Sequence, residues 1–182
     1  MMENIIITAH PSSNGFTHKI AQKIYQENKN SKIINLFEIK EQLKFLEFEN
    51  LKEDFPINDK IKEIQNEILN CEKIYFIFPI WNLSEPAILK NFFDLVFTAG
   101  FAFKYTKDTK LKPLPLLKGK TAVIYTTCDA PKWIYTIIGN PAKRIWKLRL
   151  NLCGINLKKF KIIDKMRLKT LQEKEEILLS IK

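Results

Sequence analysis

Short apolar runs rich in β-branched residues alternate along this chain with stretches whose apolar residues recur every three or four positions. The first pattern is typical of buried strands and the second of amphipathic helices. Strands that alternate with helices require a parallel sheet with right-handed crossovers and helices on both faces. We therefore expect an α/β fold with five strands at residues 4–9, 32–37, 73–79, 121–127 and 158–163.

Five helical stretches separate or follow these runs. The first begins at residue 16, and the other four cover residues 57–69, 86–97, 141–152 and 171–179. Pro86 suits the first turn of its helix, and Gly154 suits the end of the fourth. The charged region 38–60 is the only candidate insertion, and neither a repeat nor a Gly/Ser linker divides the 182 residues. One domain over residues 1–182 is expected.

Composition narrows the class of protein further. The longest apolar runs fall far short of the roughly 20 residues that cross a bilayer, and the N-terminus has no signal-peptide pattern. We expect a cytoplasmic protein without a transmembrane segment. Three widely spaced cysteines and two histidines predict neither disulfides nor a zinc site.

The chain carries thirty basic and twenty acidic residues, a net charge of +10. Such a surface favours anionic partners such as phosphates, nucleic acid or anionic lipid. The lysines could also reflect an AT-rich genome. Because the basic clusters are interrupted by apolar residues, as in ordinary helices and strands, nucleic-acid binding is not expected. A peripheral membrane partner stays open.

The loop after the first strand, HPSSNGFT at residues 10–17, places an imidazole and several hydroxyl and amide groups before a helix N-terminus. Ligands of parallel α/β sheets bind beyond the carboxyl ends of the strands, and helix N-termini attract phosphate. His10 could add a hydrogen bond or charge. The alternative is that Ser13 or Asn14 only caps the helix. No dinucleotide or triphosphatase glycine motif is present, so a flavin phosphate is predicted.

Three segments resemble the flavodoxin-like NAD(P)H:quinone oxidoreductases. His10-Pro11 with Phe16 is similar to their phosphate loop, and FPIWNLSEPAILK at residues 78–90 is similar to their isoalloxazine loop. Residues 93–105 and 129–155 resemble the continuation of that family. The resemblance runs from residue 4 to about residue 160. It implies a flavodoxin-like fold, with a five-stranded parallel sheet in the order 2-1-3-4-5.

The resemblance also implies a flavin site and a reaction. FMN is favoured over FAD because the chain ends soon after the fifth strand, and NADH or NADPH would supply hydride for a quinone or another planar acceptor. The residues expected to bind the flavin are His10, Ser12, Asn14, Gly15, Phe16, Thr17, Pro79, Ile80, Trp81, Asn82, Leu83, Thr127, Cys128 and Asp129.

Tyr135 and Tyr105 are candidate hydrogen-bond donors to the acceptor, although either could be a packing residue. Trp81, with Trp133, Phe101 and Phe103, could form an aromatic slot for a planar acceptor, or these side chains could belong to the core.

Gly15, Asn82 and Cys128-Asp129 depart from the residues usual in the family. The resemblance therefore does not determine which side chains face the substrate. Asp129 is expected to face a loop amide or solvent, because negative charge beside a reduced flavin is unfavourable. Cys128 is expected to pack rather than react.

Several functional alternatives stay open. The acceptor could be an azo or nitroaromatic compound or dioxygen, or the chain could be a flavin-binding regulatory subunit of a potassium-efflux transporter. A one-electron flavodoxin carrier is disfavoured, because such carriers are acidic and this chain is basic. The resemblance implies a homodimer, for which the apolar stretch 92–103 would suit the interface.

Overall fold

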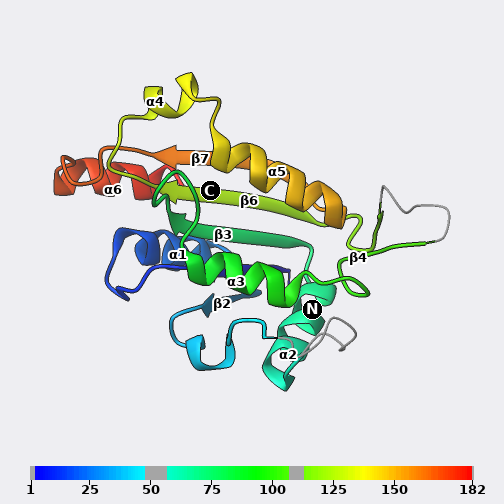
Figure 1. The fold of residues 1–182 in the computed structure, drawn as a ribbon. Helices are drawn as coiled ribbons and strands as arrows, with labels where there is room; N and C mark the ends of the chain where they lie inside the picture. The colour runs from blue at the N-terminus through cyan, green and yellow to red at the C-terminus, as the bar shows by residue number, and fades with distance from the viewer. Residues whose placement is uncertain (1–2, 48–56, 107–112, 182) are drawn as a thin grey trace.

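A five-stranded parallel sheet forms the centre of the computed structural model, which describes residues 3–47, 57–106 and 113–181 (Figure 1). Its strands lie in the order β2-β1-β3-β6-β7. Counting only these five strands along the chain, the order is 2-1-3-4-5, which confirms the prediction. Their bounds are Asn4–Thr8 (β1), Ser31–Asn35 (β2), Lys73–Pro79 (β3), Thr121–Thr127 (β6) and Asn156–Ile163 (β7).

Helices cover both faces of the sheet, as the alternating pattern predicts. On one face lie α1 (Phe16–Glu27) and α6 (Leu171–Leu179). On the other, the nearer face in Figure 1, lie α2 (Asp59–Asn70), α3 (Ala87–Val96) and α5 (Pro141–Cys153). None of the helices in the described residues is both long and apolar enough to cross a membrane.

The aromatic stretch at α3 packs inward. Phe92, Phe93 and Phe97 are buried, and the rings of Phe93 and Phe97 stack 4.4 Å apart. Trp146 of α5 is fully buried, 4.7 Å from the ring of Phe76 in β3. The apolar side chains of residues 92–97 fill the core between α3 and the sheet, so this part of the stretch offers little surface for the predicted homodimer interface, which stays a prediction.

Four short elements were not predicted. α4 (Lys132–Ile137) lies in a segment expected to be a loop, and the 3-10 turn Lys40–Gln42 lies in the candidate insertion. β4 (Phe103–Lys104) pairs antiparallel with β5 (Leu114–Pro115). These elements are too short to show a hydrophobic period. Residues 48–56 of the candidate insertion lie outside the described residues.

The strand register brings three exit loops to one edge. Pro79 pairs with Thr127, and Thr127 pairs with Ile163. The ladder continues one residue further, since the Ile80 N–H donates to the Thr127 carbonyl at 2.7 Å and the Cys128 N–H donates to the Ile163 carbonyl at 3.0 Å. The loops that follow β3, β6 and β7 thus start side by side.

Candidate functional site

A cavity of about 360 Å³ opens at this carboxyl edge. That volume lies within the roughly 300–1,000 Å³ typical of small-molecule sites. Four loops supply its lining: His10, Phe16 and Thr17 after β1; Pro79, Ile80 and Trp81 after β3; Thr127, Cys128 and Asp129 after β6; Met166 and Arg167 after β7. Nine of these eleven residues were predicted from the sequence. Met166 and Arg167 were missed, although the fifth predicted strand had to bring its exit loop to the same edge.

The N-terminus of α1 faces this region without a side-chain cap. Gly15 is the N-cap residue, and no side chain accepts from the first N–H groups of α1. The alternative that Ser13 or Asn14 caps the helix is therefore wrong. The first turn also has no acidic residue, so its amide donors and the helix dipole favour a bound anion.

His10 shapes the phosphate loop rather than only lining it. Its Nδ1 accepts a hydrogen bond from the Ser12 N–H at 3.0 Å. A Cβ atom at Gly15 would lie 3.0 Å from the same Nδ1 and 3.3 Å from the Ser12 carbonyl oxygen. The glycine therefore allows the loop to pack closely against the imidazole.

The loop after β3 is a two-residue hairpin. Trp81 and Ser84 exchange both backbone hydrogen bonds, at 2.9 and 3.0 Å. The central residues Asn82 and Leu83 have φ values of 48° and 68°, the left-handed pair that a type I′ turn requires. Trp81 lines the cavity with 45% of its surface exposed. Asn82 and Leu83 form the turn and do not line the cavity.

The loops after β6 and β7 are joined to each other. Asp129 accepts a hydrogen bond from the Arg167 N–H at 3.1 Å and pairs with the Arg167 Nε at 2.9 Å. The Met166 N–H donates to the Cys128 carbonyl at 3.1 Å. The expectation that Asp129 faces a loop amide is confirmed, and the guanidinium compensates its charge.

Cys128 is buried, and its thiol donates to the Ala130 carbonyl at 3.3 Å. Burial raises the pKa of the Cys128 thiol, so the thiol is protonated at neutral pH. Cys71 and Cys153 are likewise buried, and all three cysteines are unbridged, as predicted.

The two candidate tyrosines lie outside the cavity lining. Tyr135 is buried against Ile80 and Cys128, and burial, reinforced by the neighbouring Cys128, raises its pKa to about 12. Tyr105 is 60% exposed directly after β4, with its ring edge-on to Phe103 at 5.7 Å. In Figure 1, β4 lies at the opposite end of the sheet from the carboxyl edge. Their role as proton donors stays a prediction.

A second cavity, of about 400 Å³, adjoins the first and shares part of its wall. The lining residues are Asn14, Phe16, Lys19, Met166, Arg167, Leu171 and Lys174. Asn14 therefore lies beside the main cavity rather than in it. The three cations add positive potential beside the N-terminus of α1.

A family model described as the flavodoxin-like fold matches residues 2–179. The chain belongs to this family. An FMN-dependent NADH:quinone oxidoreductase of Caldicellulosiruptor bescii is 31% identical over 97% of this chain and 98% of its own length. Other relatives align over 52% to 67% of their own length.

Two solved structures resemble this flavodoxin-like chain over nearly its whole length. A protein of Streptococcus mutans UA159 has a TM-score of 0.84 at 25% identity, covering 99% of this chain and 96% of its own. An NAD(P)H:quinone oxidoreductase from Methanothermobacter marburgensis has a TM-score of 0.78 at 20% identity, covering 99% and 95%.

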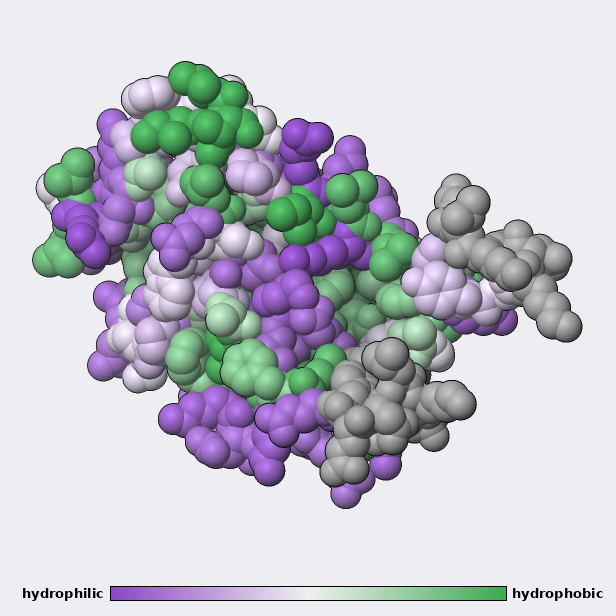
Figure 2. Space-filling model, viewed as in Figure 1, coloured by the Kyte–Doolittle hydropathy of each residue, from purple (hydrophilic) through white to green (hydrophobic). Residues whose placement is uncertain are grey.

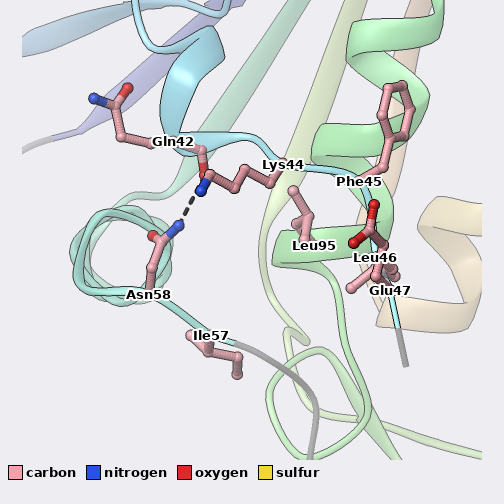
Figure 3. Close-up of a pocket in the computed structure, with 8 residues that line it drawn as sticks. All are labelled: Gln42, Lys44, Phe45, Leu46, Glu47, Ile57, Asn58 and Leu95. Atoms are coloured by element: carbon pink, nitrogen blue, oxygen red, sulfur yellow. Dashed lines mark hydrogen bonds between the residues drawn. The ribbon is translucent and has the colours of Figure 1, made fainter. Parts of the chain in front are cut away.

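A further hollow of about 400 Å³ lies away from the carboxyl edge of the flavodoxin-like sheet (Figure 3). Its lining residues are Gln42, Lys44, Phe45, Leu46, Glu47, Ile57, Asn58 and Leu95. Asn58 caps α2 and donates a hydrogen bond to the Gln42 carbonyl at 2.8 Å. The polar groups of Asn58 are thus used within the chain, and this hollow is the weaker candidate for a cofactor.

Proposed function

We propose that the chain binds FMN in the cavity at the carboxyl edge and passes hydride from NADH, or NADPH, to a quinone. The observation that carries the proposal is the pairing of two features in one cavity. An uncapped helix N-terminus supplies a phosphate site, and a tight hairpin with a half-exposed tryptophan supplies a site for a planar ring. The name printed for the relative of C. bescii supports the same cofactor and reaction.

The residues of the cavity fit FMN. The N–H groups at the start of α1, with Lys19 and Arg167 nearby, would hold the phosphate. Residues 79–81 and 127–129 would hold the isoalloxazine ring between their two loops. Bound FMN supplies the hydride chemistry, which no side chain of the protein can provide.

The side chains then supply position and a suitable electrostatic environment. Ile80 and the protonated Cys128 form apolar wall, and Arg167 compensates the charge of Asp129. Negative charge from that carboxylate therefore opposes electron transfer into the site only weakly. Trp81 presents a flat apolar surface at the open side, where a planar acceptor would stack.

We also propose a cytoplasmic homodimer whose interface is formed by α4 and α5. Figure 2 shows hydrophobic residues gathered over α4 and, interspersed with hydrophilic ones, over α5. Trp133 and Ile137 of α4 are 61% and 75% exposed, and Leu148 of α5 is 70% exposed. Large apolar side chains exposed together in this way are typical of interaction sites.

Reconstitution tests the proposal. The purified protein, or its apoprotein mixed with FMN, should be yellow, bleach with NADH under anaerobic conditions and regain colour when menadione is added. Trp81→Ala should retain less FMN. A protein that takes up neither FMN nor FAD would disprove the cofactor site, whereas flavin that no nicotinamide nucleotide reduces would favour the regulatory-subunit alternative.

A further inference from the structure

A buried carboxylate lies directly after the Trp81–Ser84 hairpin. Glu85 is the only charged residue among the described ones that is buried, and its side chain is 2% exposed. Removing a charge from water costs several kcal/mol, and that cost is offset only by close partners. The site therefore requires a specific arrangement around Glu85.

Helix α5 supplies most of that arrangement. The Arg149 guanidinium donates to Glu85 Oε1, and the Trp146 Nε1 donates to Oε2 at 3.3 Å. The Ser84 hydroxyl donates to the same Oε2 at 2.8 Å. Arg149 also lies over the ring of Phe93, 5.7 Å from its centroid, so its guanidinium is held from two sides.

The hairpin before Glu85 needs such an anchor. Asn82 and Leu83 both occupy the left-handed region, which costs non-glycine residues about 1–3 kcal/mol and persists only where the surroundings enforce it. One end of the hairpin is held through the Ile80 N–H on β6. At the other end, Ser84 donates to Glu85, and Glu85 is in turn bonded to Arg149 of α5.

We propose that Glu85 is a positioning residue that, through Arg149 and Trp146, holds the Trp81–Ser84 hairpin in the shape that receives the flavin ring. The inference rests on the proposed FMN site. A well-packed apolar pair would serve stability alone at least as well as a buried ion pair does. The carboxylate adds what an apolar side chain cannot, which is directional bonds that fix where the hairpin lies.

Glu85→Gln is the first test, because it keeps the shape of the side chain and removes its charge. FMN titration of the apoprotein, followed by flavin fluorescence, should give a Kd raised about tenfold or more, equivalent to about 1.4 kcal/mol. Glu67→Gln is the matched control, since it breaks the ion pair with Lys32 between α2 and β2. An FMN Kd that changes equally in both variants, or in neither, would overturn the proposal.

The double variant Glu85→Leu with Arg149→Met separates positioning from stability. It should unfold at a temperature near that of the wild type, yet keep the weakened FMN binding and an altered visible circular dichroism of bound flavin. Arg149→Lys should restore part of the affinity lost in Arg149→Met. FMN binding by the double variant as tight as in the wild type would show that Glu85 is only structural.

Amide hydrogen exchange of the apoprotein distinguishes failure of this inference from failure of the proposed function. The N–H groups of Trp81 and Ser84 should exchange faster in Glu85→Gln than in the wild type and in Glu67→Gln. If the wild type binds no FMN, this comparison still decides whether Glu85 holds the hairpin. Unchanged exchange at both amides would refute the anchor itself.

Discussion

The hydroxyl groups of Thr17 and Thr127 lie 3.5 Å apart where α1 meets the end of β6. Both side chains are buried, and both line the candidate FMN cavity. Buried hydroxyls need partners, and this pair leaves acceptor and donor capacity for a ligand. At the scale of single residues, the proposed recognition of FMN would therefore depend on side chains that solvent hardly reaches.

Thr17→Val should weaken FMN binding about fivefold, since one hydrogen bond contributes about 1 kcal/mol. The hydroxyl is lost while the shape of the side chain is kept, so the melting temperature of the apoprotein should change little. Thr126→Val is the matched control, because Thr126 is buried one residue earlier in β6 and its hydroxyl donates to the Lys161 carbonyl. Equal loss of affinity in the two variants would argue against contact between Thr17 and FMN.

The Glu85 carboxylate should make stability depend on pH. Burial by itself would raise its pKa, but the hydrogen bonds and charge of Arg149 outweigh burial and leave the pKa lowered. A lowered folded-state pKa stabilises the protein above the ordinary carboxyl pKa of about 4.3, and this contribution is lost as pH falls below it. Urea unfolding between pH 7 and pH 3 should show a steeper loss for the wild type than for Glu85→Gln. Parallel curves would contradict this.

At the scale of elements, α5 is capped at both ends. Asn140 caps its start by accepting from the Lys143 N–H at 3.2 Å, and Pro141 follows in the first turn. Gly154 ends it with φ at 85°. Because α5 carries both Trp146 and Arg149, its ends also determine where the two donors to Glu85 lie.

Gly154→Ala should lower the free energy of unfolding more than Gly119→Ala does. Both glycines have φ near +90°, so both variants bear the left-handed penalty of roughly 1–2 kcal/mol. Only at Gly154 would the new Cβ lie 2.9 Å from the Pro115 Cβ, whereas the space around Gly119 is open. Overpacking adds about 1–3 kcal/mol. Denaturant unfolding measures the difference, and equal losses would contradict the close contact.

At the scale of the whole molecule, positive charge and exposed apolar side chains occur together on α4 and α5. Residues 130–163 contain eight lysines and arginines and no acidic residue, and they include the exposed apolar side chains of α4 and α5. A two-fold contact through these helices would bring like charges together. Hydrophobic burial must therefore drive any dimer, and salt should strengthen it by screening the repulsion.

Leu148→Lys should convert the proposed dimer to monomer, because it removes apolar contact and adds a like charge. Sedimentation velocity at low and high salt measures the change, with tighter association of the wild type at high salt. Leu69→Lys is the control, since Leu69 is 52% exposed on α2, away from α4 and α5. Dimers that persist in Leu148→Lys would place the interface elsewhere.

The fold and most of the cavity could be predicted from local pattern. The apolar runs show which segments pair as strands, and the helical periods show which segments cover the sheet. In a parallel sheet, the loops that follow the strands then lie at one edge. Nine predicted residues, including His10, Trp81 and Thr127, meet there for that reason. The two-residue strands β4 and β5 and the six-residue helix α4 could not be predicted, because each is too short for its hydrophobic period to repeat.

The sequence by itself determined the order of strands and helices and the loops that surround the ligand. Only the tertiary structure decided which polar groups are used within the chain and which face the cavity. It buries Tyr135 behind the cavity wall, joins Arg167 to Asp129 and places Arg149 on Glu85. These partners lie 38 and 64 positions apart in the latter two pairs. Contacts over such separations leave no periodic trace in the sequence, because they arise from the packing of whole elements.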